Sequence, residues 1–246
     1  MLKKFVSFIV ATKNREKYIP DLIDSFISQN DERWEAIIVN DHGSDKTKKI
    51  IERYGDDRLR YYELLDDHGH GASCARNFGA VMSECDILAI MDDDDICYPD
   101  RVSITIEAFN NNPKLDVFYG SIDIWEEELG TIRDRKTPIA PATLKRMKKE
   151  YFIPHPTVAL RKQVLLDNPY NQFFRYAEDY DLMSRLMSKG YNFSYTNKKL
   201  IKYRIAGQNI SIGKDREKIV DQYCEIVKMS RGWKERNSSV IEGLQQ

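Results

Sequence analysis

The chain has 246 residues, of which 41% are hydrophobic and 31% are charged, as is typical of a globular protein. Its 38 lysines and arginines nearly balance its 39 aspartates and glutamates, so no strong positive field argues for a nucleic-acid partner. The four cysteines show no spacing typical of a metal site, and we interpret them as the reduced thiols of a cytoplasmic protein.

The N-terminus faintly resembles a signal peptide, because two lysines precede the apolar residues 5–11. This apolar run is short and leads directly into polar residues without a small-residue cleavage site, so a first buried strand is the better interpretation. No stretch approaches the roughly 18 apolar residues that span a bilayer. We expect a cytoplasmic protein, and peripheral contact with the inner face of a membrane stays open.

Apolar strands alternate with helical patterns in the first half of the chain. Strands are expected at residues 5–11, 36–39, 59–65, 87–91 and 117–125. Between them, helices with one apolar face are expected around residues 18–27, 47–54, 72–83 and 101–110. The alternation predicts right-handed crossovers and a mostly parallel sheet, and continuously apolar strands favour helices on both faces of that sheet.

The pattern changes after about residue 126. Residues 126–141 are polar and contain two prolines, which predicts a loop or an irregular hairpin, and residues 145–150 form a short basic helical piece. The remaining elements are a strand at 157–160, a helix at 177–189, strands at 193–196 and 200–205, and a C-terminal helix at 214–233. The last dozen residues are polar and are expected to fray.

Four consecutive aspartates, Asp92–Asp95, follow the fourth strand. Ligands of a parallel sheet gather beyond the carboxyl ends of its strands, where residues 12–15 and 40–45 are also expected. In an extended segment Asp92 would point with Asp94, and Asp93 with Asp95. Carboxylates placed in this way suit Mg²⁺ or Mn²⁺, which complete their shell with phosphate oxygens and water. The aspartates thus predict a site for a divalent cation and a diphosphate, with a solvated acidic turn as the alternative.

Five segments in the same order resemble those of family 2 glycosyltransferases, which are inverting enzymes of the GT-A fold. The segments are Val6–Arg15, Glu35–Asp45, Gly71–Asn77, Asp92–Asp95 and Glu178–Leu182. The resemblance implies one α/β domain over residues 1–246, with a Rossmann-like, mostly parallel sheet flanked by helices and a smaller mixed C-terminal region. Residues 1–126 would bind a nucleotide sugar, and residues 127–246, with the C-terminal helix, would bind an acceptor.

The resemblance also implies roles in binding the nucleotide. Asp41 would accept hydrogen bonds from the nucleobase, with uracil favoured, although His42 leaves the alignment there open by one residue. Capping of the next helix is the alternative role of Asp41, and Ser44 and Asp45 are better placed for it. The same pocket would be lined by Thr12, Asn14 and Arg15.

Around the diphosphate, the resemblance places Asp92 beside the ribose and the metal, and Asp93 toward the phosphates. Asp94 would be the direct ligand of Mn²⁺ or Mg²⁺, and Asp95 would support the turn. Arg76 would steady the nucleotide, with simple solvation on an exposed helix face as the alternative.

Asp179, next to Glu178, would be the general base that deprotonates the acceptor hydroxyl as it attacks the anomeric carbon. The alternative is that both carboxylates only stabilise the start of a helix, which is worth about 0.3–1 kcal/mol each. An ordinary aspartate is a weak base, so burial near Glu178 would have to raise the pKa of Asp179.

Two further candidate residues lie outside the five matched segments. His155, between two prolines, would contact the acceptor or a phosphate, or would simply pack in a loop. Arg204 would pair with the diphosphate, since guanidinium groups suit phosphate oxygens. Ala206 stands where the family often has a histidine, and Gln208 would be the substitute for that contact.

We therefore expect a metal-assisted, inverting transferase that moves a sugar from a nucleotide diphosphate to a glycan, lipid-linked or other hydroxyl acceptor. The alternative is a non-catalytic nucleotide-sugar-binding module or partner subunit. A sugar-1-phosphate nucleotidyltransferase is disfavoured, because residues 12–15 lack the glycine-rich, arginine-containing loop that it predicts. The basic residues 145–149 and the C-terminal helix are interpreted as solvated faces rather than as a membrane or acceptor contact.

Overall fold

The computed structural model describes residues 5–135, 139–206 and 214–232, and for residues 214–220 it describes the backbone only. Within these ranges a nine-stranded sheet runs through the centre, in the order β3-β2-β1-β4-β8-β6-β9-β5, and β7 pairs with β6. The strands are β1 (Val6–Thr12), β2 (Trp34–Asn40), β3 (Leu59–Glu63), β4 (Ile87–Asp92), β5 (Ile96–Cys97), β6 (Val117–Glu126), β7 (Thr131–Asp134), β8 (Ala159–Arg161) and β9 (Phe193–Ile205).

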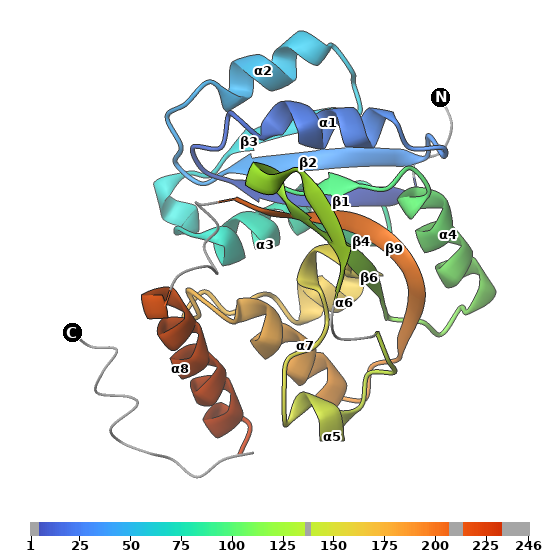
Figure 1. Ribbon diagram of the computed structural model, residues 1–246, viewed down its shortest axis with the longest axis vertical. Helices are drawn as coiled ribbons and strands as arrows, with labels where there is room; N and C mark the ends of the chain where they lie inside the picture. Colours follow the sequence, from blue (N-terminus) through green and yellow to red (C-terminus); the bar gives the residue numbers. More distant parts are fainter. Residues whose placement is uncertain (1–4, 136–138, 207–213, 233–246) are drawn as a thin grey trace.

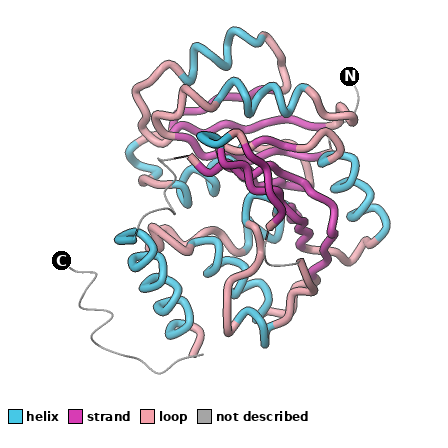
Figure 2. Tube along the Cα trace, in the orientation of Figure 1, coloured by secondary structure: helices cyan, strands magenta, loops and turns pink. Residues whose placement is uncertain are grey.

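Helices cover the two faces of this sheet (Figure 1). They are α1 (Ile19–Ile27), α2 (Thr47–Tyr54), α3 (Ala72–Met82), α4 (Arg101–Asn111), α5 (Leu144–Met147), α6 (Lys162–Asp167), α7 (Glu178–Ser188) and α8 (Lys214–Ser230). On one face, the helices α1, α2 and α4 share a core with the strands, and on the other face α3, α6 and α7 do so. Figure 2 shows the strands as a continuous layer between these two sets of helices.

The alternation of side chains along the strands explains the two cores. Ile9 and Ile37 pack on the side of α3, whereas Phe8, Val10 and Ile38 pack on the side of α1. All five side chains are fully buried, so each strand is apolar on both faces. The four adjacent strands β3, β2, β1 and β4 are parallel, as the sequence predicts.

The second half of the sheet is mixed. β8 is antiparallel to both β4 and β6, and β9 runs parallel to β6 with a register shift along the way. The two strands expected at 193–196 and 200–205 are one long strand, β9, which curves across the sheet (Figure 1). The polar segment after residue 126 forms a hairpin, because β7 pairs with the end of β6.

The C-terminal helix α8 packs against α7. Asp181 of α7 is fully buried and accepts hydrogen bonds from Arg185 Nε at 2.8 Å and from Nη2 of Arg231, directly after α8, at 2.6 Å. The helix ends at Ser230, slightly earlier than expected, and the residues predicted to fray lie outside the described part. None of the helices, as far as they are described, is both long and apolar enough to cross a membrane.

Candidate active site

The carboxyl ends of three neighbouring strands form the rim of the candidate site. Thr12 of β1 lies opposite Asn40 of β2, and Ala11 lies opposite Asp92 of β4. The loops after these strands therefore start side by side. The expected convergence of polar loops at one sheet edge is present, because the register of β1 with its two neighbours brings them together.

The aspartate run is a turn rather than the expected extended segment. Asp92 is the last residue of β4, and the next two residues form a turn in which the Asp95 amide lies 3.4 Å from the Asp92 carbonyl. Asp93 and Asp94 consequently both pair with the guanidinium group of Arg15, whose Nε is 3.7 Å from Asp93 and whose Nη2 is 3.3 Å from Asp94. Asp95 turns inward, and its carboxylate accepts the Arg204 amide at 2.8 Å.

The turn concentrates negative charge in a buried place. Burial, followed by the charge of Asp94, raises the pKa of Asp93 to about 7, although Thr12 and Arg15 oppose the shift. Burial and the charge of Asp92 raise the pKa of Asp94 to about 6. Arg15, Arg76 and Arg204 all lie near these carboxylates, yet the raised pKa values of Asp93 and Asp94 indicate that negative charge at the turn is still unfavourable, and a further cation would relieve it.

This donor set fits a divalent cation such as Mg²⁺ or Mn²⁺. Its ligands are carboxylate oxygens, and Asp92 and Asp94 retain some exposure, at 28% and 12% of their side chains. In the described part of the chain, no three of these aspartates bring ligand atoms within 4.8 Å of one another. The carboxylates therefore suit an ion that takes one or two protein ligands and completes its shell with phosphate and water.

Arg76 of α3 connects the aspartate turn to a distant segment of the chain. Its Nη2 donates to Asp92 at 2.9 Å, and its Nη1 donates to Glu178 at 2.8 Å. The side chain is only 8% exposed, which rules out the solvated alternative. A single guanidinium thus brings the end of β4 and the start of α7 together.

Asp179 lies in the first turn of α7, after Ala177 in the left-handed conformation with φ of 56°. Its Oδ1 accepts the Tyr180 amide at 2.7 Å. Burial and the neighbouring charge of Glu178 raise the pKa of Asp179 to about 7, whereas Arg76 lowers it. The shift is in the direction that a general base would require. Burial and the charge of Asp179 also raise the pKa of Tyr151 well above its usual range, so that phenol lies near the Asp179 carboxylate.

Asp41 follows β2 at the same rim and is 7% exposed. Burial alone would raise its pKa, but hydrogen bonds from the Gly71 amide and His42, with the charge of Lys13, leave the pKa below its usual value. The N-cap position of α2 is Lys46, and the amide of Thr47, the first residue of the helix, is accepted by Asp45 Oδ1 at 3.1 Å rather than by Asp41. The carboxylate of Asp41 is thus ionised and has no role in the cap.

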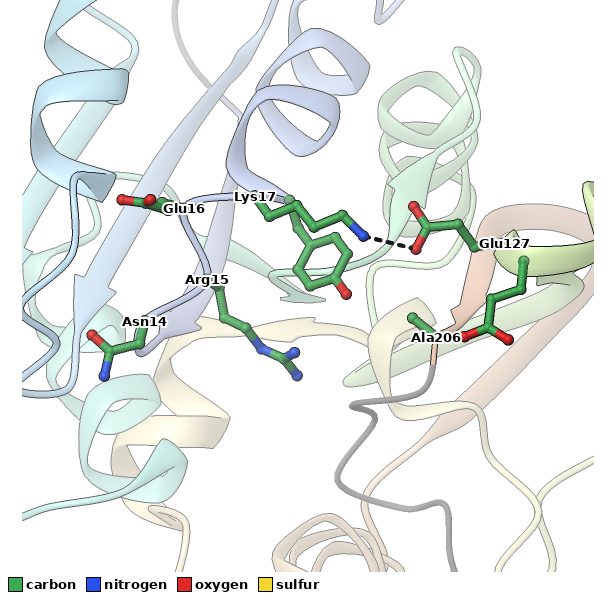
Figure 3. A pocket seen from close by; sticks show the side chains of 8 residues that line it. Asn14, Arg15, Glu16, Lys17, Glu127 and Ala206 are labelled. Atoms are coloured by element: carbon green, nitrogen blue, oxygen red, sulfur yellow. Dashed lines mark hydrogen bonds and ion pairs between the residues drawn. The ribbon is translucent and has the colours of Figure 1, made fainter.

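The loop after β1 lies against the loop after β2. Asn14, with φ of 55°, accepts the Ser44 amide on its Oδ1 at 2.8 Å. The approach is close: a Cβ added to Gly43 would lie 2.9 Å from the Asn14 amide nitrogen. Beside this loop is a pocket of about 660 Å³, across which Lys17 and Glu127 reach toward each other (Figure 3). The pocket is lined by Asn14, Arg15, Glu16, Lys17, Tyr18, Glu127, Glu128 and Ala206.

Arg204 is buried at the end of β9 and differs from its predicted role. Its Nε donates to the Asp94 carbonyl at 2.7 Å, and its terminal nitrogens pair with Asp21 at 2.6 Å and Glu127 at 2.5 Å. The guanidinium also lies 4.3 Å from the ring centre of Trp125. These contacts place Arg204 to hold the aspartate turn rather than to contact a diphosphate. Gln208, the suggested substitute near Ala206, lies outside the described residues.

His155 is also buried, and its Nε2 lies 2.7 Å from the Tyr170 hydroxyl. Burial and the charge of Arg76 lower the pKa of His155 well below its usual range, so the imidazole is neutral. The packing alternative therefore describes this histidine better than an acceptor contact. Tyr170 itself was not predicted; its backbone is held by both side-chain atoms of Asn77, at 2.8 and 2.9 Å.

Comparison with known proteins finds a matching family and related sequences. The family described as "Glycosyl transferase family 2" matches residues 7–168. An uncharacterized glycosyltransferase of Methanocaldococcus jannaschii is 26% identical over 215 residues, which cover 85% of this chain and 73% of that protein. The UDP-Glc:alpha-D-GlcNAc-diphosphoundecaprenol beta-1,3-glucosyltransferase WfgD of Escherichia coli is 28% identical over 214 residues, covering 86% and 81%.

Solved structures show the fold. TarS of S. aureus, in complex with UDP-GlcNAc, is 21% identical with a TM-score of 0.69, and 92% of this chain is covered. A mannosyltransferase from Pyrobaculum calidifontis, in complex with GDP-Man and Mn²⁺, is 12% identical with a TM-score of 0.68, and 96% is covered. The chain spans 66% of each of those two chains, just under two thirds of their length. The predicted α/β fold of the GT-A type is confirmed.

Proposed function

The chain belongs to glycosyl transferase family 2, and on that premise we propose that it transfers a sugar, with inversion, from a nucleotide diphosphate to an acceptor hydroxyl. The observation that carries the proposal is the position of Arg76, whose guanidinium contacts Asp92 at 2.9 Å and Glu178 at 2.8 Å. It brings the acidic turn that suits a diphosphate next to the carboxylate pair that suits a base. A donor site and a base in one place are what sugar transfer requires.

The donor is a nucleotide diphosphate sugar, with UDP favoured as the nucleotide. Asp41 is ionised, 7% exposed and not used as a helix cap, and its carboxylate, which already contacts the Gly71 amide, His42 and Lys13, would accept a further hydrogen bond from a base. The relatives WfgD and TarS are named or solved with UDP-sugars, which supports uracil. GDP is the second candidate, because the mannosyltransferase structure contains GDP-Man. Thr12 and Arg15 line the same rim.

Asp179 acts as the general base in this proposal. With a pKa raised to about 7, the carboxylate is both ionised in a useful fraction and basic enough near neutral pH. The acceptor hydroxyl loses its proton to Asp179 while its oxygen bonds to the anomeric carbon. The bond from that carbon to the diphosphate oxygen breaks on the opposite face, and its electron pair leaves with the diphosphate. The configuration inverts, and no covalent intermediate forms.

The aspartate turn would hold the diphosphate end of the donor. Asp94 and Asp92 would be the protein ligands of a divalent cation, and that cation would supply positive charge to the departing diphosphate. Arg15 neutralises Asp93 and Asp94 in part, and Arg204 fixes the Asp94 carbonyl. The side chains that face the phosphates are thereby held in place before the donor binds.

The acceptor would be a glycan or a lipid-linked sugar with a free hydroxyl. WfgD, by its name, acts on a sugar carried by diphosphoundecaprenol, which supports the lipid-linked option. Residues 127–246 would bind this acceptor, since α7 and its base belong to that half. A lipid-linked acceptor would require peripheral contact of the protein with a membrane.

The test measures release of the nucleotide diphosphate from UDP-glucose, UDP-GlcNAc and GDP-mannose with Mn²⁺. Wild type should release it, and Asp179→Asn should slow release by about a hundredfold or more while it still binds the nucleotide in calorimetry. Asp57→Asn, at an exposed aspartate before β3, is the matched control and should not change the rate. Equal rates in Asp179→Asn and wild type would overturn the base. Binding of a nucleotide by wild type without release from any donor would favour the non-catalytic module.

A further inference from the structure

A second cluster of ligating side chains lies on the rim, away from the aspartate turn. It consists of Asp41, His42 and His70, whose ligand atoms all lie within 4.8 Å of one another. We infer that these three residues form a site for a transition metal of the zinc type, distinct from the magnesium or manganese position at Asp92 and Asp94. Binding of the metal would compete with the nucleobase for Asp41; this consequence rests on the proposed function, whereas the site does not.

The donor atoms of the cluster argue for zinc rather than magnesium. Two imidazoles and one carboxylate make an N₂O set, which Zn²⁺, Co²⁺ and Ni²⁺ prefer, whereas Mg²⁺ prefers oxygen. A tetrahedral site with bonds of about 2.0–2.1 Å needs donor atoms about 3.4 Å apart. His42 Nδ1 and Asp41 Oδ1 are already 3.1 Å apart. His70 is exposed, so rotation of its side chain can close the remaining gap.

The surroundings of His42 resemble those of a metal-bound histidine. Its Nδ1 faces Asp41, and its Nε2 lies 3.0 Å from Oδ1 of the exposed Asp66, which makes no hydrogen bond to it in this geometry and would have to turn slightly to accept one. A carboxylate behind the second ring nitrogen is the usual partner of a ligating histidine, because it fixes the tautomer and the direction of the lone pair. The His70 ring lies against the His42 ring, with centroids 4.1 Å apart, so both imidazoles are on the same side of Asp41.

The site is separate from the aspartate turn. Asp41 follows β2 and Asp92 ends β4, and β1 lies between those two strands. With neighbouring strands about 4.8 Å apart, the two positions are about 10 Å from each other. Because Asp41 is the proposed acceptor of hydrogen bonds from the base, its carboxylate cannot serve the metal and the base at once. Zinc would therefore inhibit the transferase competitively with the donor, while Mn²⁺ supports activity at the other position.

The test uses the full chain without an affinity tag, in the absence of nucleotide. Zn²⁺ is titrated by calorimetry, and Co²⁺ is added as a probe whose visible absorption reports a tetrahedral nitrogen-containing site. Wild type should bind one equivalent, and His70→Gln should bind about tenfold more weakly or worse. His68→Gln is the matched control, because His68 lies on the same loop but contacts Asp67 and Phe78. It should bind as wild type does.

The two titrations decide the inference. Equal affinity in wild type, His70→Gln and His68→Gln, or no bound equivalent in wild type, would overturn the metal site whatever the transferase activity is. Loss of Zn²⁺ binding in His70→Gln alone supports it. A second titration in saturating uridine, which has no phosphates to bind Zn²⁺ itself, separates this inference from the proposed function. Zn²⁺ binding that uridine weakens supports competition at Asp41, and Zn²⁺ binding that uridine leaves unchanged keeps the site and overturns the role of Asp41 in binding uracil.

Discussion

In this account Arg76 joins the donor site to the base, and replacing it should lower the free energy of unfolding by a measurable amount. Arg76→Gln removes the positive charge that lies between Asp92 and Glu178 and leaves two carboxylates without their partner. Breaking a buried ion pair costs about 3–5 kcal/mol. Because the Asp92 and Glu178 side chains are 28% and 16% exposed, water offsets part of this, and we expect the free energy of unfolding to fall by about 2–3 kcal/mol.

The change also acts on the base. Arg76 lowers the pKa of Asp179, so its removal raises that pKa further above the present value of about 7. The acid limb of kcat/KM should therefore move to higher pH in Arg76→Gln. Arg76→Lys keeps the charge but cannot fork to two carboxylates, so it should lose less stability and move the limb less.

Urea unfolding at neutral pH measures the first effect, and a pH profile of kcat/KM measures the second. Arg53→Gln, which removes an exposed arginine in the last turn of α2, is the matched control and should stay within about 0.5 kcal/mol of wild type. If Arg76→Gln costs no more than Arg53→Gln and leaves the pH profile in place, the guanidinium does not join the two carboxylates as described.

Three further results are expected. In wild type, kcat/KM should rise with pH around pH 7, since Asp179 must lose its proton to act as a base, and a profile that is flat across this range would contradict its pKa of about 7. Without metal, the free energy of unfolding should fall as pH rises from about 4 toward 7, because folding raises the pKa of Asp93 to about 7 and that of Asp94 to about 6. Thermal unfolding at several pH values should show a smaller fall in Asp93→Asn, and addition of Mn²⁺ to wild type should restore the lost stability. Gly43→Ala should cost about 1–3 kcal/mol in urea unfolding and weaken UDP binding, because its new methyl would lie 2.5 Å from Asn40 Oδ1 and 2.9 Å from the Asn14 amide nitrogen; unchanged stability would show that the Asn40 side chain and the loop after β1 can both move aside freely.

The apolar runs predicted the parallel half of the sheet well, because a strand covered by helices on both faces is a continuous run of apolar residues in the sequence. The strand boundaries of β1, β2 and β4 are within about two residues of those expected. The long strand β9 was divided into two, because its polar residues 197–199 resemble a turn in sequence, although Lys199 pairs with Ser121 of β6. Pairing with β6 outweighs local preference there.

The candidate site was predicted in its residue types but not in its connections. Arg76 and Glu178 are 102 positions apart, and no local pattern indicates that they touch. Arg204 shows the opposite case: an arginine near a predicted diphosphate site suggested a phosphate contact, but Asp21 and Glu127 already bind its guanidinium. The expected pairing of Asp92 with Asp94 on a strand face also failed, because the chain turns directly after β4.

The central claim is that the aspartate turn binds a divalent cation together with a nucleotide diphosphate. The most direct measurement is calorimetric titration of UDP and GDP into wild type and Asp94→Asn, with and without Mn²⁺. We expect one of the two nucleotides to bind wild type at least about tenfold more tightly with Mn²⁺, and Asp94→Asn to lose this gain while it folds normally. Equal affinity with and without Mn²⁺ in wild type, or a full gain in Asp94→Asn, would contradict the account.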